Sequence, residues 1–198
     1  HITLLGIGMG SKETLTIQGN EAVEQADLII GARRMADAVA LPGQDVFYEY
    51  RSAEIAEYIK KHPEYEKVVI ALSGDVGFYS GAKGLLKALD GNAEIICGIS
   101  SVVYFMSKIG LSWDDAKIVS AHGRVCNLVS LIRTNQKVFA ILGTSDGTAH
   151  LAQKLTDYGI GEVQLYVGEN LSYEDEKIFV KQARELTDYR GDALSVIC

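Results

Sequence analysis

The sequence predicts an α/β fold of two small domains with mainly parallel sheets. Short apolar segments alternate with segments of helical periodicity through the first half of the chain, which is typical of a parallel sheet covered by helices. At 198 residues the chain can form one large or two small units. An apolar helix stops near Gly110–Asp115 and the chain changes character there, so we expect an N-terminal domain at 1–111 and a C-terminal domain at 112–198.

The first half of the chain predicts strands and helices in regular succession. Residues 2–5 form an apolar strand, and the glycine-rich loop 6–10 follows it at once. Further strands are expected at 27–31, 45–50, 68–72 and 93–96, and helices at 33–39, at 53–61 and after residue 101. Ser52 is the expected N-cap of the helix 53–61, because a serine oxygen can accept a hydrogen bond from a free amide there.

The second half predicts a smaller α/β unit. Strands are expected at 117–119, 138–142 and 162–167, with helices through 128–132 and 151–155, the second closed by Gly159. Residues 168–171 are expected to be a loop. The alternating or apolar segments 176–181 and 193–197 are expected to be strands, paired as an antiparallel edge pair.

The stretch 69–81 is the first candidate for a ligand site. A buried strand ends there in Ser73-Gly74-Asp75-Val76-Gly77-Phe78, and open α/β sheets bind small molecules at the carboxyl ends of their strands. Asp75 is either a polar contact to the ligand or the stabiliser of an Asx-type turn. The loop 6–10 reads G-x-G-x-G, with its third glycine one residue too early for the dinucleotide-binding fingerprint. It is either a ligand contact or a simple turn.

Composition excludes several classes of function. The net charge of -7 argues against a nucleic-acid backbone or an anionic membrane as the main partner. No apolar run reaches the length of about 18 residues that a membrane helix needs, and no signal peptide is recognisable, so we expect a cytoplasmic protein. The three cysteines lack CxxC spacing and are odd in number, which favours reduced thiols, and no metal site is expected.

Taken together, five loops in order resemble the tetrapyrrole methylase family of S-adenosylmethionine methyltransferases. They are Gly6-Ile7-Gly8-Met9-Gly10, Ser73-Gly74-Asp75-Val76-Gly77-Phe78, Gly98-Ile99-Ser100-Ser101, Leu142-Gly143 and Gly168-Glu169-Asn170-Leu171. Four further segments resemble the branch that methylates C5 of cobalt-precorrin-7: residues 31–34, 113–116, 120–124 and 167–176. The alternatives are methylation of another ring carbon and a non-catalytic module that binds a ligand.

The resemblance implies an S-adenosyl-L-methionine cleft between the two domains. The cofactor contacts that it implies are Gly8, Met9, Gly74, Asp75, Phe78, Ser100, Ser101, Leu142 and Leu171. Ser100 and Ser101 are equally suited to cap the following helix. The substrate, a cobalt-precorrin, bears many carboxylates, which suit arginine, and the candidates are Arg33, Arg34 and Arg124. His122 and Glu169 are the candidate catalytic groups near the macrocycle, with structural hydrogen bonding as the alternative for each.

The resemblance also implies partners. Family members are commonly homodimers, so a homodimer is expected. Some relatives carry a fused domain for C15 methylation and decarboxylation, which we expect here to be a separate protein of the same pathway. Two residues depart from the family pattern, because Met9 and Val76 stand where proline is usual. Proline fixes φ, so its loss relaxes a loop without deleting a side-chain contact.

Overall fold

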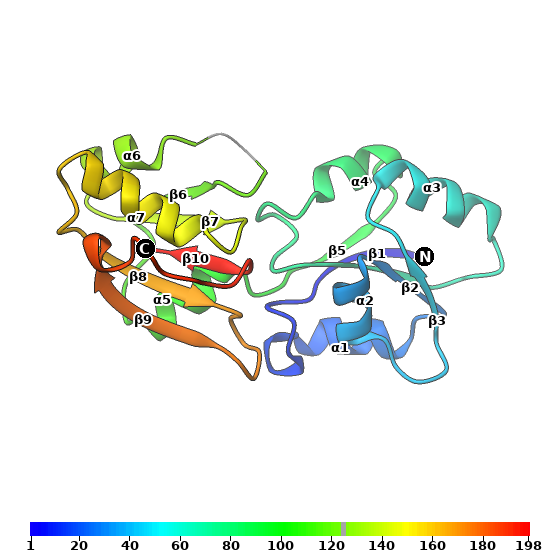
Figure 1. Ribbon diagram of the computed structural model, residues 1–198. Helices are drawn as coiled ribbons and strands as arrows, with labels where there is room; N and C mark the ends of the chain where they lie inside the picture. The colour runs from blue at the N-terminus through cyan, green and yellow to red at the C-terminus, as the bar shows by residue number, and fades with distance from the viewer. Residues whose placement is uncertain (124–125) are drawn as a thin grey trace. The chain divides into compact units, whose positions relative to one another are not determined.

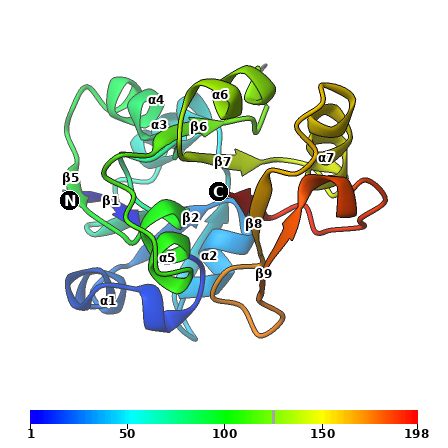
Figure 2. The ribbon, with the colours of Figure 1, turned by 90° about the vertical axis from the view of Figure 1, so that its left-hand side faces the viewer.

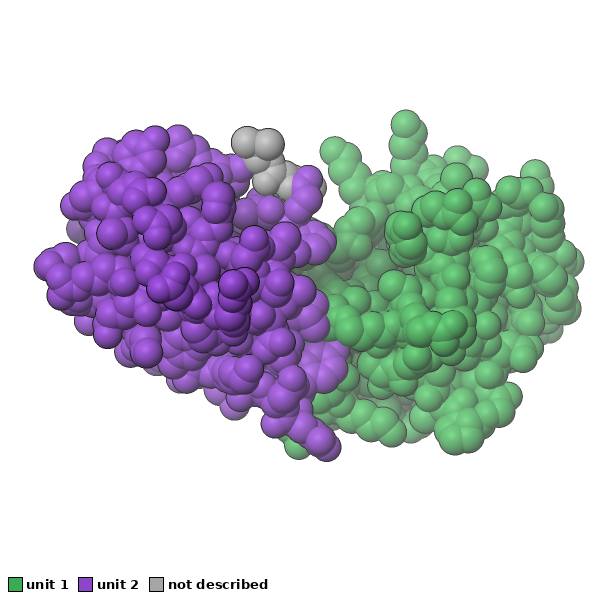
Figure 3. All heavy atoms as spheres, viewed as in Figure 1, with its two compact units in different colours: residues 1–100 green, residues 101–198 purple. Residues whose placement is uncertain are grey.

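The computed structural model describes residues 1–123 and 126–198 (Figure 1). It divides into two compact units, which Figure 3 colours separately: unit 1 is His1–Ser100 and unit 2 is Ser101–Cys198. The division falls before helix α5 (Ser101–Lys108), whereas the boundary expected from sequence falls after it. Phe105 of α5 lies against Phe139, with ring centroids 6.3 Å apart, so this helix packs on unit 2.

Unit 1 contains a fully parallel sheet. Within residues 1–100 its five strands run in the order β3-β2-β4-β1-β5. The bounds are β1 Ile2–Gly6, β2 Leu28–Gly31, β3 Asp45–Tyr48, β4 Val68–Leu72 and β5 Glu94–Ile96. All four neighbouring pairs are parallel, so the carboxyl ends of the strands, and the loops that follow them, meet at one edge of the sheet.

Helices cover both faces of this sheet. Helices α1 (Ile17–Glu24) and α2 (Arg33–Val39) lie on one face, and α3 (Ser52–Lys61) and α4 (Ala82–Ala88) on the other (Figure 1). A 3₁₀ turn, η1 (Lys12–Thr14), follows the first glycine loop. Successive strand residues face opposite cores, since Leu4 packs with Ile55 and Leu85 while Leu5 packs with Val23. Burial on both faces explains why the strands read as continuous apolar runs.

The start of α3 differs from the prediction. The helix begins at Ser52 itself, and Arg51 occupies the N-cap position without a side-chain cap hydrogen bond. The Ser52 side chain lies against α4 instead, because a Cβ added at Gly84 would be 2.9 Å from Ser52 Oγ. The prediction that Ser52 caps the helix is therefore wrong, and the close approach of α3 and α4 is the physical reason.

Unit 2 contains a mixed sheet. Within its described residues the strands run in the order β6-β7-β10-β8-β9. Their bounds are β6 Lys117–Ser120, β7 Val138–Leu142, β8 Gln164–Glu169, β9 Lys177–Gln182 and β10 Ser195–Ile197. Only the β6/β7 pair is parallel, and the three pairs that involve β8 or β10 are antiparallel. The sheet thus differs from the mainly parallel pairing that the alternation of elements predicts.

Two local predictions for unit 2 are corrected. β10 lies between β7 and β8, while β9 pairs with β8, so the predicted pairing of 176–181 with 193–197 at an edge is wrong. The three residues of β10 are all buried, which suits a central strand. Gly168 and Glu169 belong to β8, because they pair with both neighbouring strands, and the loop begins only at Asn170.

The helices of unit 2 also lie on two faces. Helices α6 (Leu128–Thr134) and α7 (Gly147–Asp157), with the 3₁₀ turn η2 (Ala183–Glu185), pack over one face of the sheet. Figure 2 shows α5 and α7 on opposite sides of β8. Val167 and Ile197 face α6 and α7, so by strand alternation Glu169 and Ser195 face the same side. Among the residues that the structure describes, no helix is long and apolar enough to span a bilayer.

Candidate functional site

Two glycine loops of unit 1 are joined by backbone hydrogen bonds at the carboxyl edge of its sheet. Gly8, after β1, pairs with Gly74, after β4, in an isolated antiparallel bridge. The amide of Gly8 donates to Gly74 O at 3.1 Å, and the amide of Gly74 donates to Gly8 O at 2.8 Å. Both glycines have positive φ, at 71° and 69°, which other residues adopt only with strain. The two predicted loops thus form one structure.

A third loop, after β5, is in close contact with the other two. A Cβ added at Gly98 would lie 2.2 Å from Gly74 O and 2.4 Å from Gly6 O. Real Cβ atoms do not approach backbone oxygens so closely, so only glycine fits. Glycines here permit the backbones after β1, β4 and β5 to approach one another.

Asp75 connects the second and third loops through its carboxylate. Its Oδ1 accepts a hydrogen bond from the amide of Gly77 at 2.8 Å, which is an Asx-type turn. Its Oδ2 accepts from the amide of Gly98 at 3.1 Å, across to the loop after β5. The side chain is half-buried. The structural alternative raised by the sequence is therefore present, and contact of Asp75 with a ligand stays a prediction.

The other predicted positions of unit 1 lie around these loops. The amide of Met9 donates to Thr14 Oγ1 at 3.0 Å, and Met9 Cε lies 3.6 Å from the position of a Cβ at Gly74. Ser100 is buried, and its Cα lies 3.7 Å from that same position. Phe78 closes the Asp75 turn, since its amide donates to Asp75 O at 3.0 Å. An added Cβ at Gly74 would be in van der Waals contact with both Met9 and Ser100, so these three predicted positions lie close together.

Arg33 and Arg34 lie at the same edge, further along the sheet. Both are exposed in the first turn of α2, directly after β2. The Arg33 guanidinium lies 4.2 Å from the ring centroid of Tyr48, a cation–π contact that fixes its direction. Tyr48 is 43% exposed, so this pair presents a positive charge and an aromatic ring to solvent. Arg124, the third predicted arginine, lies outside the described residues.

Sequence reasoning missed an ion pair that follows β3. The carboxylate of Glu49 accepts from Arg51 Nε at 3.1 Å and from Arg51 Nη2 at 2.6 Å. It also accepts from the amides of Tyr50 and Arg51, at 2.8 and 2.9 Å. The hydrogen bonds from Arg51 and these amides lower the pKa of Glu49 from 4.5 to about 2. The only signal in the sequence is a Glu-x-Arg triplet at a strand end. Such triplets are too common to predict a bidentate ion pair.

The Glu49 carboxylate is expected to make unit 1 more stable at neutral than at acidic pH. Its pKa is lower in the folded state than in the unfolded state, so its contribution is complete above the ordinary pKa of 4.5 and is lost as pH falls toward 2. Thermal unfolding of Glu49→Gln should therefore occur at a lower Tm than that of the parent at neutral pH. The difference should shrink as pH falls through this window. Glu54→Gln, which removes the exposed second partner of Arg51, is the control and should change Tm little.

In unit 2 the predicted residues His122 and Leu142 follow neighbouring strands. His122 comes after β6 and Leu142 ends β7, and these strands are parallel. A Cβ at Gly143 would lie 2.6 Å from His122 Nδ1, so glycine makes room for the imidazole. His122 is exposed, and its amide lies 3.3 Å from Ser120 Oγ. The imidazole of His122 therefore lies at the carboxyl ends of β6 and β7, beside Gly143.

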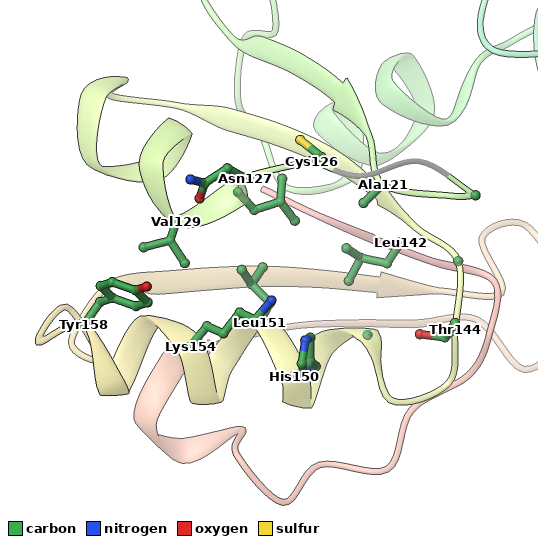
Figure 4. Close-up of a pocket in the computed structure, with 14 residues that line it drawn as sticks. Ala121, Cys126, Asn127, Val129, Leu142, Thr144, His150, Leu151, Lys154 and Tyr158 are labelled. Carbon is green, nitrogen blue, oxygen red and sulfur yellow. The ribbon is translucent and has the colours of Figure 1, made fainter.

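A cavity of about 500 Å³ opens beside Leu142, between α6 and α7 (Figure 4). Its apolar floor includes Val129, Leu142 and Leu151, while His150 and Lys154 of α7 supply polar groups. This volume lies within the range of about 300 to 1,000 Å³ that small-molecule pockets occupy. His150 and Lys154 are four residues apart on α7, a spacing that places both side chains on one face of the helix.

Glu169 is held inside unit 2. Its side chain is fully buried, its Oε2 accepts from the Tyr189 hydroxyl at 2.9 Å, and its Oε1 accepts from the amide of Asp192 at 3.1 Å. Burial, and then this hydrogen bond to Glu169, raise the pKa of Tyr189 to about 12, so the phenol keeps its proton and donates. The carboxylate thus ties the segment before β10 to β8. Its role near a substrate stays a prediction.

The loop after β8 carries Leu171 in a strained backbone. Asn170 and Ser172, on either side of it, have φ of 48° and 70°. Each left-handed residue other than glycine costs on the order of 1 to 3 kcal/mol, and such strain clusters at functional sites. Leu171 itself is buried, and a Cβ at Gly168 would lie 3.0 Å from its Cδ2.

Neither metal clusters nor disulfides are found in the described residues. No group of three or more His, Cys, Asp or Glu side chains there is arranged to hold a metal ion. The three cysteines are free thiols, with Cys97 exposed and Cys126 and Cys198 half-buried.

Comparisons with known proteins agree on one family. The model of the family described as Tetrapyrrole (Corrin/Porphyrin) Methylases matches residues 1–187. A Methanocaldococcus jannaschii protein named as probable cobalt-precorrin-7 C(5)-methyltransferase is 32% identical, over 94% of this chain and 92% of its own. A Salmonella typhimurium cobalt-precorrin-7 C(5)-methyltransferase is 28% identical, over 99% of this chain and 98% of its own.

A solved structure shares the fold of this chain. The structure of uroporphyrin-III C-methyl transferase from Thermus thermophilus, complexed with S-adenyl homocysteine, superposes with a TM-score of 0.76 at 20% identity, covering all of this chain and 96% of its own. At that identity the likeness establishes the fold alone, while the family match spans most of the sequence. The chain belongs to the tetrapyrrole methylases, a family of S-adenosylmethionine-dependent C-methyltransferases.

Proposed function

We propose that this chain transfers a methyl group from S-adenosyl-L-methionine to C5 of cobalt-precorrin-7 in cobalamin biosynthesis. The observation that carries the proposal is the 32% identity, over 94% of the chain, with a relative that bears that name. The joined glycine loops of unit 1 support it, because they bring backbone groups together at the edge of the sheet where α/β folds bind small molecules.

The residues of the chain act in this proposal mainly by alignment. Bound S-adenosyl-L-methionine supplies a methyl group activated by a sulfonium. The backbones of Gly8, Met9 and Gly74 hold the cofactor. Asp75 holds the loop after β4 against the loop after β5 through its hydrogen bond from the amide of Gly98. Holding donor and acceptor in line supplies several kcal/mol of the barrier to transfer. Phe78, Ser100, Ser101, Leu142 and Leu171 are the further proposed cofactor contacts.

The substrate is oriented by its carboxylates in this proposal. Arg33 and Arg34 offer exposed guanidinium groups, which suit carboxylates, and Arg124 is proposed from sequence alone. His122 accepts the proton that the ring releases, which contributes about 10²-fold or more to the rate. Glu169, buried and doubly hydrogen-bonded, contributes by fixing β8 and the segment before β10.

The deciding experiment is methyl transfer to defined substrates. The protein is incubated with S-adenosylmethionine carrying a ¹³C-methyl group and with each cobalt-precorrin in turn, and the labelled carbon is located by NMR. We expect label at C5 of cobalt-precorrin-7. Label at another carbon would establish the alternative of a different ring position. Calorimetry with S-adenosylhomocysteine tests the remaining alternative, since a non-catalytic module for another ligand would not bind it at millimolar concentration.

Asp75→Ala is expected to weaken S-adenosylhomocysteine binding by about tenfold or more and to lower the free energy of unfolding by about 2 kcal/mol. The change leaves the amides of Gly77 and Gly98 without their shared carboxylate. Calorimetry and denaturant unfolding measure the two effects. Asp75→Asn, which keeps one oxygen acceptor, should fall between the parent and Asp75→Ala. Equal affinity in all three proteins would remove Asp75 from the cofactor site.

The assembly and place of action belong to the same proposal. We infer a cytoplasmic homodimer that acts before or after a separate protein for C15 methylation and decarboxylation. Light scattering of the purified protein tests the dimer, and a monomer mass at micromolar concentration would contradict it.

A further inference from the structure

Two elements of unit 2 carry proposed cofactor contacts and are joined by a polar bridge. Helix α5 begins at Ser101, and the loop after β8 carries Leu171. Tyr104, nearly one helical turn after Ser101, donates its hydroxyl proton to Glu176 Oε2 at 2.7 Å, across 72 residues of sequence. The bridge therefore connects the start of the helix to the far end of the loop.

Glu176 is the centre of this bridge. The same Oε2 accepts a second hydrogen bond, from the amide of Ser172 at 2.6 Å, and Lys108 Nζ lies 3.8 Å from Oε1. The side chain is only 22% exposed. Burial, and then the hydrogen bond to Glu176, raise the pKa of Tyr104, so its hydroxyl stays a donor at neutral pH. One carboxylate thus holds both the helix and the loop.

The loop needs such a support because its backbone is strained. Asn170 and Ser172 both have left-handed backbone conformations. The amide of Ser172 donates the hydrogen bond that Glu176 accepts. A second restraint acts at the other end, where Asn170 Nδ2 donates to Asp175 Oδ2 at 2.7 Å and the Asn170 amide donates to Leu194 O at 3.0 Å. Strained residues persist only where surrounding groups over-determine their conformation, and they are concentrated at ligand clamps.

An apolar contact supports the same junction. A Cβ at Gly168 would lie 2.6 Å from Phe105 Cε2 and 3.0 Å from Leu171 Cδ2, so Phe105 and Leu171 both approach the backbone of β8 at one glycine. Phe105 follows Tyr104 in α5. The helix and the loop are thus fixed together by a polar bridge and by a shared contact at Gly168.

We propose that Glu176 and Tyr104 are positioning residues that hold the Leu171 loop against α5 in the conformation that binds the cofactor. The inference rests on the proposed function, since it gives a role to residues that flank two of its cofactor contacts. Neither residue touches the reacting atoms in this proposal. Both act through the loop backbone, so their loss changes affinity for the cofactor more than the rate at saturation.

The test uses Glu176→Gln, Tyr104→Phe and the double variant. Calorimetry should show S-adenosylhomocysteine binding about tenfold weaker for Glu176→Gln and about threefold weaker for Tyr104→Phe. The double variant should resemble Glu176→Gln, because both changes remove contacts of one carboxylate. The KM for S-adenosylmethionine should rise while kcat at saturation stays near that of the parent. Glu174→Gln, in the same loop and exposed, is the matched control and should bind as the parent does.

The outcomes separate this inference from the proposed function. A parent protein that fails to bind S-adenosylhomocysteine would overturn the proposed function and this inference with it. A parent that binds, together with a Glu176→Gln variant of equal affinity, would overturn only the positioning role. Should Glu176→Gln fail to fold, Tyr104→Phe decides, since it removes a single hydroxyl, and unchanged KM in that variant would refute the proposal.

Discussion

Gly98→Ala is expected to abolish S-adenosylhomocysteine binding and to lower the free energy of unfolding by about 3 kcal/mol. The added Cβ would lie 2.2 Å from Gly74 O and 2.4 Å from Gly6 O. Both atoms belong to the backbone, so no side-chain rotation relieves the clash, and the loops after β1 and β4 must move apart. The bridge between Gly8 and Gly74, which joins these loops, would then be lost.

Gly98 has no positive φ, so the clash alone carries its effect, and Gly43 provides the opposite case. Gly43 has a φ of 90° and no heavy atom within 4 Å of an added Cβ, so Gly43→Ala tests the cost of a left-handed alanine by itself. We expect about 1 kcal/mol of destabilisation and parental affinity for S-adenosylhomocysteine. Denaturant unfolding by circular dichroism and calorimetry measure both quantities. Parental binding by Gly98→Ala would contradict the proposal that the three loops act as one site.

Phe105→Ala is expected to lower the free energy of unfolding of unit 2 by about 4 kcal/mol. The ring is fully buried, lies against Phe139 with centroids 6.3 Å apart, and fills the space over Gly168. Its removal leaves a cavity under α5 and loosens the helix that starts at Ser101. We also expect weaker cofactor binding, because Leu171 loses the packing that it shares with Phe105 at β8.

The single tryptophan makes this effect measurable in one unit. Trp113 belongs to unit 2, so its fluorescence follows unfolding there, while circular dichroism reports on both units. Val103→Ala, on the more exposed side of the same helix at 39% exposure, is the control and should stay within about 0.5 kcal/mol of the parent. A Phe105→Ala variant as stable as the parent would mean that α5 does not depend on this contact.

Burial on both faces explains which elements the sequence predicts well. Strands β4 and β7 and helix α2 have the predicted bounds, because covered strands are continuous apolar runs and the helix follows a clear glycine signal. The loops after β1, β4 and β5 were predicted as a site by their glycines and by resemblance. Their mutual contacts in the structure agree with a shared edge, while their contact with a cofactor stays a prediction.

Long-range pairing explains what the sequence does not predict. Asp75 meets the amide of Gly98 across 23 residues and Tyr104 meets Glu176 across 72, and no local pattern encodes either distance. The same holds for β10, whose short apolar segment is compatible with an edge or a central strand. Only the packing of two neighbours against it makes it central, so pattern alone favoured the wrong position.

The central position of β10 has a consequence for synthesis on the ribosome. Residues 195–197 separate β7 from β8 in the sheet, yet they are translated after every other strand of unit 2. Unit 1 has all its strands once residue 96 has emerged, so we expect it to fold while translation continues. Unit 2 cannot complete its sheet until β10 has been synthesised, because the position between β7 and β8 is unfilled. Until then the unpaired edges of these strands are exposed to chaperones and to other nascent chains.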